Sequence, residues 1–122
     1  MKMTNDEIYV TALAVQKAFA DSTQQLPVKV NFYLQKNKKA LMDLGREIED
    51  SRMETLRKYG TLNEETNQFE FDSSAAQAVM NELNDLLALE QEVKIYTVKI
   101  EDFGDNLTLT TEQMEALMFM ID

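Results

Sequence analysis

The stretch from Pro27 to Tyr59 constrains the fold more than any other part of the chain. Apolar side chains recur in it at intervals of three and four residues, the spacing of one face of an α-helix, and Gly45 is its only glycine. Proline is favoured at the first position of a helix, and Gly60 supplies a stop for which we expect the left-handed conformation. The stretch therefore predicts one helix over residues 27–59, roughly 50 Å long at 1.5 Å per residue. Its apolar stripe is Val30, Tyr33, Leu34, Leu41, Leu44, Ile48, Leu56 and Tyr59.

A helix of this length is longer than a domain of 122 residues is wide, so part of it must pack on another helix or on another chain. Gly45 costs about 1 kcal/mol relative to alanine inside a helix. We therefore expect either a close approach of a neighbouring helix at Gly45 or a local bend there. The same length predicts self-association.

Three capping boxes mark further helix starts, because a Ser or Thr side chain can cap a helix while a Glu or Gln three residues later returns the bond. The pairs are Thr4 with Glu7, Ser74 with Gln77, and Thr110 with Gln113. Asp72 competes with Ser74 as the cap of the middle helix. The pattern predicts an N-terminal helix, a helix over residues 74–90 and a short C-terminal helix.

Two segments have the composition of short strands. Residues 68–71 alternate polar and aromatic side chains, and residues 93–100 are rich in β-branched side chains. We expect these two strands to pair with each other, and the helix between them is long enough to permit a parallel pairing. The expected fold is α+β and mainly α, in a single domain over residues 1–122.

The composition argues against catalysis and against bound metals or cofactors. The chain has no cysteine and no histidine, so thiol chemistry, disulfides and the commonest metal ligand are excluded. Carboxylates remain, but Glu101, Asp102 and Asp105 lack the alternating spacing of a calcium loop, and Glu64 with Glu65 is expected in a polar turn. We expect a protein that is not an enzyme.

Charge is distributed unevenly along the chain, which carries 12 basic and 22 acidic residues and a net charge of −10. Residues 29–58 hold eight basic and five acidic side chains, so 8 − 5 gives +3, whereas residues 61–122 hold two and fourteen, so 2 − 14 gives −12. Opposed charges favour packing of one half on the other, within a chain or between copies. The alternative is that the lysines are simply the solvated face of a long helix.

Nucleic acids and membranes are poor partners for this sequence. The net charge of −10 opposes phosphate binding, and only Phe32 and Tyr33 offer stacking groups in the basic segment. No apolar run reaches the roughly 18 to 20 residues that a bilayer span requires, and the N-terminus lacks the apolar core of a signal peptide. We expect an intracellular protein.

Seven short motifs are spread along the chain: residues 26–30 (LPVKV), 34–37 (LQKN), 56–60 (LRKYG), 62–67 (LNEETN), 82–87 (ELNDLL), 92–95 (EVKI) and 109–117 (LTTEQMEAL). They resemble motifs of small proteins of unknown function encoded by bacteriophages and prophages of low-GC Gram-positive bacteria. Thr66 stands where that family usually has a glycine. The resemblance implies a non-enzymatic phage structural or assembly-accessory protein, found in the host bacterial cytoplasm or in the assembling virion.

The interaction surface is predicted from the lysine cluster and the C-terminus. Helical spacing sends Met114, Leu117, Met118 and Ile121 to one face of the last helix, which leaves Phe119 and Met120 pointing elsewhere. Methionine suits adaptable binding surfaces, although filling a core is its commoner use. The predicted surface is Lys36, Lys38, Lys39, Phe119 and Met120.

Three functional hypotheses follow. The leading one is interaction with copies of the same chain or with a phage morphogenesis or host protein partner. The alternative is an acidic inhibitor that imitates DNA and occupies a host nucleic-acid enzyme, which would need carboxylates spaced like phosphates. A hydrolase working through carboxylates and a divalent metal is third.

Overall fold

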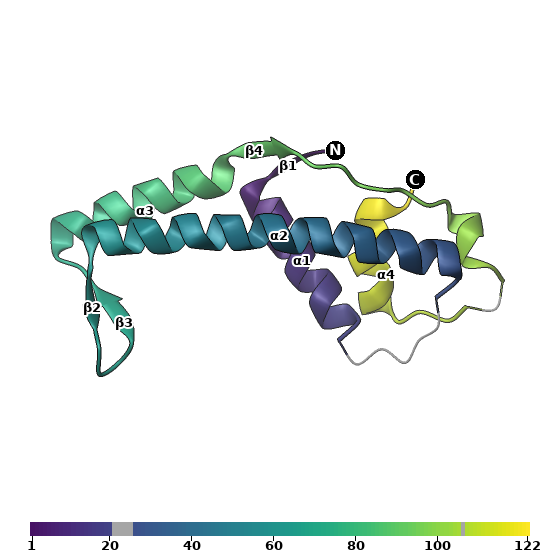
Figure 1. The fold of residues 1–122 in the computed structure, drawn as a ribbon, viewed down its shortest axis with the longest axis horizontal. Coiled ribbons are helices and arrows are strands. Elements are labelled where there is room, and N and C mark those ends of the chain that lie inside the picture. The colour runs from purple at the N-terminus through teal and green to yellow at the C-terminus, as the bar shows by residue number, and fades with distance from the viewer. Residues whose placement is uncertain (21–25, 106) are drawn as a thin grey trace.

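The computed structural model describes residues 1–20, 26–105 and 107–122, which are built along one long helix, α2 (Val28–Tyr59) (Figure 1). Helix α1 (Asn5–Ala18) crosses α2 near its middle, and α3 (Ser73–Ala88) runs along its second half. The short helix α4 (Thr111–Leu117) packs against α1. The predicted α+β fold, mainly α and organised on a long helix, is confirmed.

The strands pair differently from the prediction. Strand β1 (Lys2–Thr4) pairs antiparallel with β4 (Glu90–Glu92), and β2 (Thr61–Asn63) pairs antiparallel with β3 (Gln68–Glu70) as a hairpin. Residues 68–71 therefore do contain a strand, but their expected pairing with residues 93–100 is wrong. The partner of β3 is its sequence neighbour β2, which a short turn brings beside it.

Residues 93–100 do not form a regular strand. They continue from β4 as an extended segment that runs beside the first half of α2 (Figure 1), with a single parallel bridge between Val98 and Ile121. The segment ends in a 3₁₀ turn, η1 (Ile100–Phe103). A second such turn, η2 (Met118–Met120), follows α4 directly.

Two of the three predicted capping boxes are present. The Thr4 hydroxyl accepts from the amide of Glu7 at 3.1 Å, and the Thr110 hydroxyl accepts from the amide of Gln113 at 3.0 Å. The box at Ser74 is wrong, because the competing residue Asp72 caps α3. An ionised carboxylate is a stronger acceptor than a hydroxyl. Asp72 accepts from the amide of Ala75 at 2.8 Å and from the hydroxyl of Ser74 at 2.9 Å.

The two ends of α2 differ from the prediction, in the first helical residue and in the conformation of Gly60. Helix α2 starts one residue later than predicted, with Pro27 as the residue before its first turn. Gly60 is extended, with φ −119°, and is not left-handed. Glycine is nevertheless favoured here, because a Cβ atom at this position would lie 2.5 Å from the ring of Phe71, which would have to move.

Gly45 has open space beside it. A Cβ atom placed there would meet nothing within 4 Å in the described chain, so the expected close approach of a second helix is wrong within one copy. The glycine lies at the edge of a pocket of about 280 Å³ between α1 and α2, next to Leu13 and Met42.

Two hydrophobic clusters share α2. The first buries Val15, Val30, Leu34, Val98, Phe103, Leu117 and Met120, and the second buries Met3, Ile8, Leu41, Ile48 and Val93. Ile95 and Phe119 pack against both. The predicted stripe of α2 is therefore the core as far as Ile48, and beyond it the stripe residues are only half-buried.

Three buried polar side chains tie distant segments together. Asn5 donates to the carbonyl of Leu86 at the end of α3, and Gln113 donates to that of Ala18 at the end of α1. The third, Asn37, lies fully buried in α2. Within the described residues, every buried side-chain nitrogen and oxygen has a hydrogen-bond partner, as burial requires.

Candidate functional site

Asn37 holds the extended segment 93–99 against α2. Its amide nitrogen Nδ2 donates to the carbonyl of Tyr96 at 2.8 Å, and its oxygen Oδ1 accepts from the amide of Tyr96 at the same distance. The side chain thus makes the pair of bonds that a neighbouring strand would make. Because both backbone groups of Tyr96 are held, its backbone is kept beside α2.

The ring of Tyr96 stacks on that of Tyr33, one helical turn before Asn37. The two centroids lie 5.4 Å apart with 20° between the planes, and Phe32 adds a tilted contact with Tyr33 at 6.0 Å. Offset aromatic pairs of this kind contribute roughly 0.5–1.5 kcal/mol beyond their burial. The three rings form an aromatic platform that joins α2 to the extended segment.

Two lysines sit over this platform. The ammonium group of Lys36 lies 5.2 Å from the centroid of Phe32 and 5.3 Å from that of Tyr96, and the ammonium group of Lys94 lies 5.1 Å from that of Tyr96. An ammonium group within about 6 Å of a ring is attracted to its electron-rich face. We call Phe32, Tyr33, Lys36, Lys94 and Tyr96 the aromatic–lysine face.

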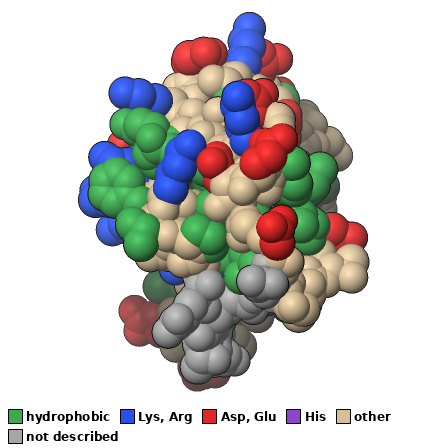
Figure 2. Space-filling model, turned by 90° about the vertical axis from the view of Figure 1, so that its right-hand side faces the viewer, with side chains coloured by type: hydrophobic (Ala, Val, Ile, Leu, Met, Phe, Trp, Pro, Cys, Tyr) green, Lys and Arg blue, Asp and Glu red, His purple; other side chains and the backbone are tan. Residues whose placement is uncertain are grey.

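The aromatic–lysine face is open to solvent. Phe32 is 56% exposed, and both lysines are exposed. Within the described residues neither lysine has a carboxylate within ion-pair distance, although acidic side chains outnumber basic ones 22 to 12. Figure 2 views the end of the molecule where α2 begins and shows hydrophobic side chains bordered by Lys and Arg.

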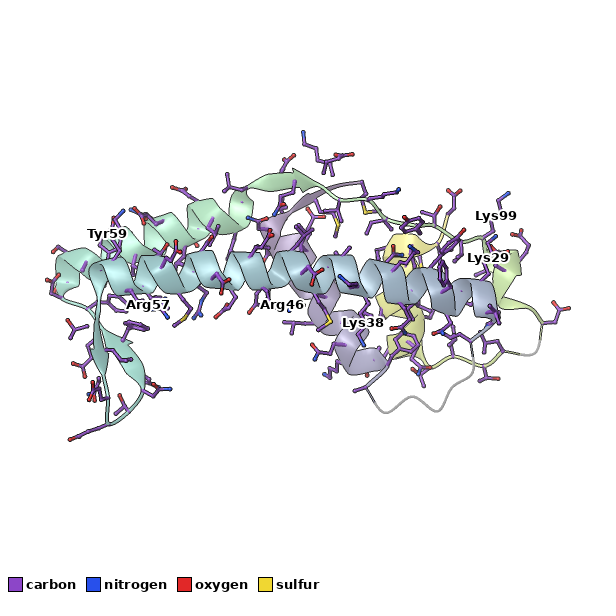
Figure 3. All side chains as sticks on the ribbon, in the orientation of Figure 1. Lys29, Lys38, Arg46, Arg57, Tyr59 and Lys99 are labelled. Atoms are coloured by element: carbon purple, nitrogen blue, oxygen red, sulfur yellow. The ribbon has the colours of Figure 1, made fainter. Side chains whose placement is uncertain are left out.

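An ion pair borders this face at the start of α2. Lys29 lies 3.1 Å from Asp102, whose carboxylate also accepts from the amide of Lys99 at 2.8 Å. The bond from the Lys99 amide and then that from Lys29 lower the pKa of Asp102 below its ordinary value. Figure 3 shows Lys29 and Lys99 together at this end of the molecule. Asp102 therefore holds the turn η1 against α2.

The structure does not bring the predicted surface residues together. Lys36 belongs to the aromatic–lysine face, but Lys38 is half-buried beside Val15 and Leu34, and Lys39 pairs with Asp43 at 3.1 Å. On a helix, residues two apart point to nearly opposite sides. Lys36 and Lys38 thus lie on different sides of α2, and Lys39, which is on the same side as Lys36, is engaged by Asp43.

The expected surface at Phe119 and Met120 is wrong. Met120 is fully buried, where its sulfur accepts a weak bond from Asn37 at 3.6 Å, and Phe119 is half-buried between the two clusters. Met118 is exposed instead, by 59%. Helical spacing fails here because α4 ends at Leu117 and the chain tightens into η2.

Lys94 and Tyr96 are the residues that sequence reasoning missed. Their spacing of two places both side chains on one side of an extended segment, which was a visible signal. No pattern in the sequence indicates that this side meets Tyr33, because the contact depends on how segment 93–99 docks on α2.

A pocket of about 400 Å³ lies between α1, α2 and α3. It is lined by Ile48 and three leucines of α3, with Asp6, Tyr9 and Arg52 at its polar side. The Tyr9 hydroxyl donates to Glu49 at 3.2 Å, and Arg52 pairs with the same carboxylate at 2.9 Å. Burial, and then the charge of Glu49, raise the pKa of Tyr9. The pocket suits an apolar group and offers no activated nucleophile.

No protein family, curated protein or solved structure matches the chain. Among the described residues, no three acidic side chains are grouped as metal ligands would be. No helix within them is long and apolar enough to cross a membrane.

Proposed function

We propose that the protein is a non-enzymatic interaction protein, of the phage structural or assembly-accessory kind that its sequence resembles. Its aromatic–lysine face binds a protein partner that presents carboxylates. The observation that carries the proposal is that Lys36 and Lys94 lie over aromatic rings without a carboxylate partner among the described residues, in a chain rich in acidic side chains.

The rings prepare the two lysines for binding. A free lysine loses up to about 2 kcal/mol of side-chain entropy when it is fixed, and a contact with a ring restricts it beforehand. Less lysine side-chain entropy is therefore lost when a carboxylate binds to the ammonium groups. The exposed ring of Phe32 adds apolar area beside the two charges.

The chemistry favours a protein partner over a nucleic acid. Phosphate binding draws its affinity from several cations, and the net charge of −10 repels a polyanion at long range. Tyr96 already has Tyr33 on one side and two ammonium groups close by, so it offers little free ring for a base. A short acidic segment with an apolar side chain fits these features better.

The test is fluorescence anisotropy with a labelled synthetic peptide of glutamates around one phenylalanine. The double variant Lys36→Glu with Lys94→Glu should weaken binding about tenfold or more, because two attractions become repulsions. The matched control, Lys17→Glu with Arg57→Glu, makes the same change in net charge at exposed residues away from the face. Equal loss in both variants would show that binding follows net charge alone and would overturn the proposal.

A second arm uses a single-stranded oligonucleotide of similar length. Binding of the oligonucleotide as tight as that of the peptide would contradict the assignment of a protein partner. The far-ultraviolet circular dichroism of each variant should match that of the wild type, because the exchanged side chains are exposed.

A further inference from the structure

The hairpin formed by β2 and β3 stands away from the rest of the molecule. It hangs from the end of α2 opposite to the aromatic–lysine face (Figure 1). Within the described residues its two strands pair only with each other, and a pocket of about 380 Å³ lined by both α2 and the hairpin lies between them. A two-stranded hairpin with so little support is marginally stable in water by itself.

The tip of this hairpin has a defined shape. Asn63 accepts from the amides of Glu65 and Thr66 at 3.0 and 3.3 Å through its side chain, and from the amide of Asn67 at 2.7 Å through its carbonyl. Asn67 takes the left-handed conformation, with φ 58°, that closes the turn. Glu64 and Glu65 are thereby held at the end of the ribbon.

The tip is the chemical complement of the aromatic–lysine face. Glu64 and Glu65 are exposed and have no basic partner within the described residues, and Leu62 beside them is 45% exposed. Residues 61–72 contain four acidic and no basic side chains. Two unpaired carboxylates near an exposed leucine thus correspond to two unpaired ammonium groups beside an exposed phenylalanine.

The two surfaces cannot meet within one copy. Lys36 lies in the first third of α2 and the hairpin follows Tyr59, so 59 − 36 = 23 residues, or roughly 35 Å of helix at 1.5 Å per residue, separate them. A straight helix keeps them apart, so any contact between them joins different copies. Such a contact pairs two different surfaces and repeats head to tail, forming a ring if the rotation closes and an open filament if it does not.

We propose that a second copy of this chain occupies the aromatic–lysine face, with Glu64 and Glu65 of its hairpin bound to Lys36 and Lys94. This inference rests on the proposed function and names its partner. The exposed Leu62 of the hairpin packs beside Phe32 in the same contact. Each copy gives one hairpin and receives another, so the assembly grows in one direction.

The experiment reverses each side of the contact in turn. One variant carries Lys36→Glu with Lys94→Glu, and the other carries Glu64→Lys with Glu65→Lys. Light scattering and sedimentation velocity are measured over a wide range of micromolar concentrations. The wild type should self-associate, whereas each variant alone should stay monomeric, because like charges then face each other.

The equimolar mixture of the two variants decides the matter. In the mixture every hairpin meets a face of opposite charge, so association should return to within about threefold of the wild-type affinity. The control Lys17→Glu with Arg57→Glu should associate like the wild type. A monomeric wild type, variants that associate as well as the wild type, or a mixture that stays monomeric would each overturn the inference.

The acidic-peptide titration shows whether only the inferred self-association is wrong or the proposed function is wrong as well. If the peptide binds the wild type and not the face variant while the wild type stays monomeric, the face binds carboxylates but its partner is another protein. If the face variant binds the peptide as well as the wild type does, the proposed function falls together with the inference.

Discussion

Asn37 does not belong to the aromatic–lysine face, but it holds Tyr96, which does. Its replacement should therefore disturb the face strongly. Leucine has the same branched arrangement of heavy atoms as asparagine, although its methyl groups are bulkier, and it forms no hydrogen bond, so Asn37→Leu leaves the amide and the carbonyl of Tyr96 without their partner. Each polar group stranded in this way costs about 1–3 kcal/mol. Leucine in place of the amide returns about 1–2 kcal/mol through apolar burial.

The net loss in the free energy of unfolding should therefore be about 2–3 kcal/mol, since Tyr96 is only half-buried and water reaches part of the stranded pair. For a domain of this size this lowers the melting temperature by roughly 8–12 °C. Urea titration followed by far-ultraviolet circular dichroism measures the free energy. The near-ultraviolet signal of the tyrosines should fall as well, because Tyr96 no longer stacks firmly on Tyr33.

The matched control is Asn31→Leu, an exposed asparagine on the same helix that accepts one long bond from Gln35 at 3.4 Å. Its cost should stay within about 0.5 kcal/mol. In the acidic-peptide titration Asn37→Leu should bind more weakly than Asn31→Leu. An Asn37→Leu protein as stable as the wild type would refute the view that this side chain anchors the extended segment.

Three further predictions concern glycines, caps and acid. Gly60→Ala should destabilise the protein by about 1–3 kcal/mol, because the new methyl group meets the ring of Phe71. Gly45→Ala should stabilise it by about 0.5–1 kcal/mol, because alanine favours a helix and has open space there, so thermal melts of the two variants should shift in opposite directions. Asp72→Ala should cost about 1 kcal/mol and Ser74→Ala little, and urea titration giving the reverse order would return the cap to the serine. Tyr59 and Lys58 donate to Glu82 and lower the pKa of its carboxyl below the ordinary value of 4.5. The stabilisation from these bonds is therefore present above pH 4.5 and is lost as the pH falls through the lowered pKa. Glu82→Gln should flatten this part of the plot of stability against pH, and an unchanged plot would contradict the assignment.

Local signals in the sequence predicted the fold well where the interaction spans only a few residues. Thr4 and Thr110 each accept from a backbone amide three residues later. The apolar stripe of α2 marks the face of the helix on which other segments pack. These features depend on nearest neighbours along the chain, so their patterns can be read directly.

The site was less predictable because it depends on distant segments. Tyr96 reaches Tyr33 only through the bonds of Asn37, and a polar residue inside a helical stripe does not tell which backbone it will bond. Met120 was misplaced because a short helix changed to a 3₁₀ turn, which shifts every later side chain by tens of degrees. Residues 93–100 have the composition of a strand, yet a side chain of α2 takes the place of a neighbouring strand.

The two hydrophobic clusters that share α2 cover only its first part, so the two parts of the helix should unfold separately. Between Val30 and Ile48 the helix is buried on one side, and beyond Ile48 its stripe is only half-covered. Amide hydrogens in the first part should exchange with solvent only when the whole molecule unfolds, whereas those of the last turns should exchange through local opening. The hairpin is attached to these last turns, so its tip can change direction while both clusters remain intact.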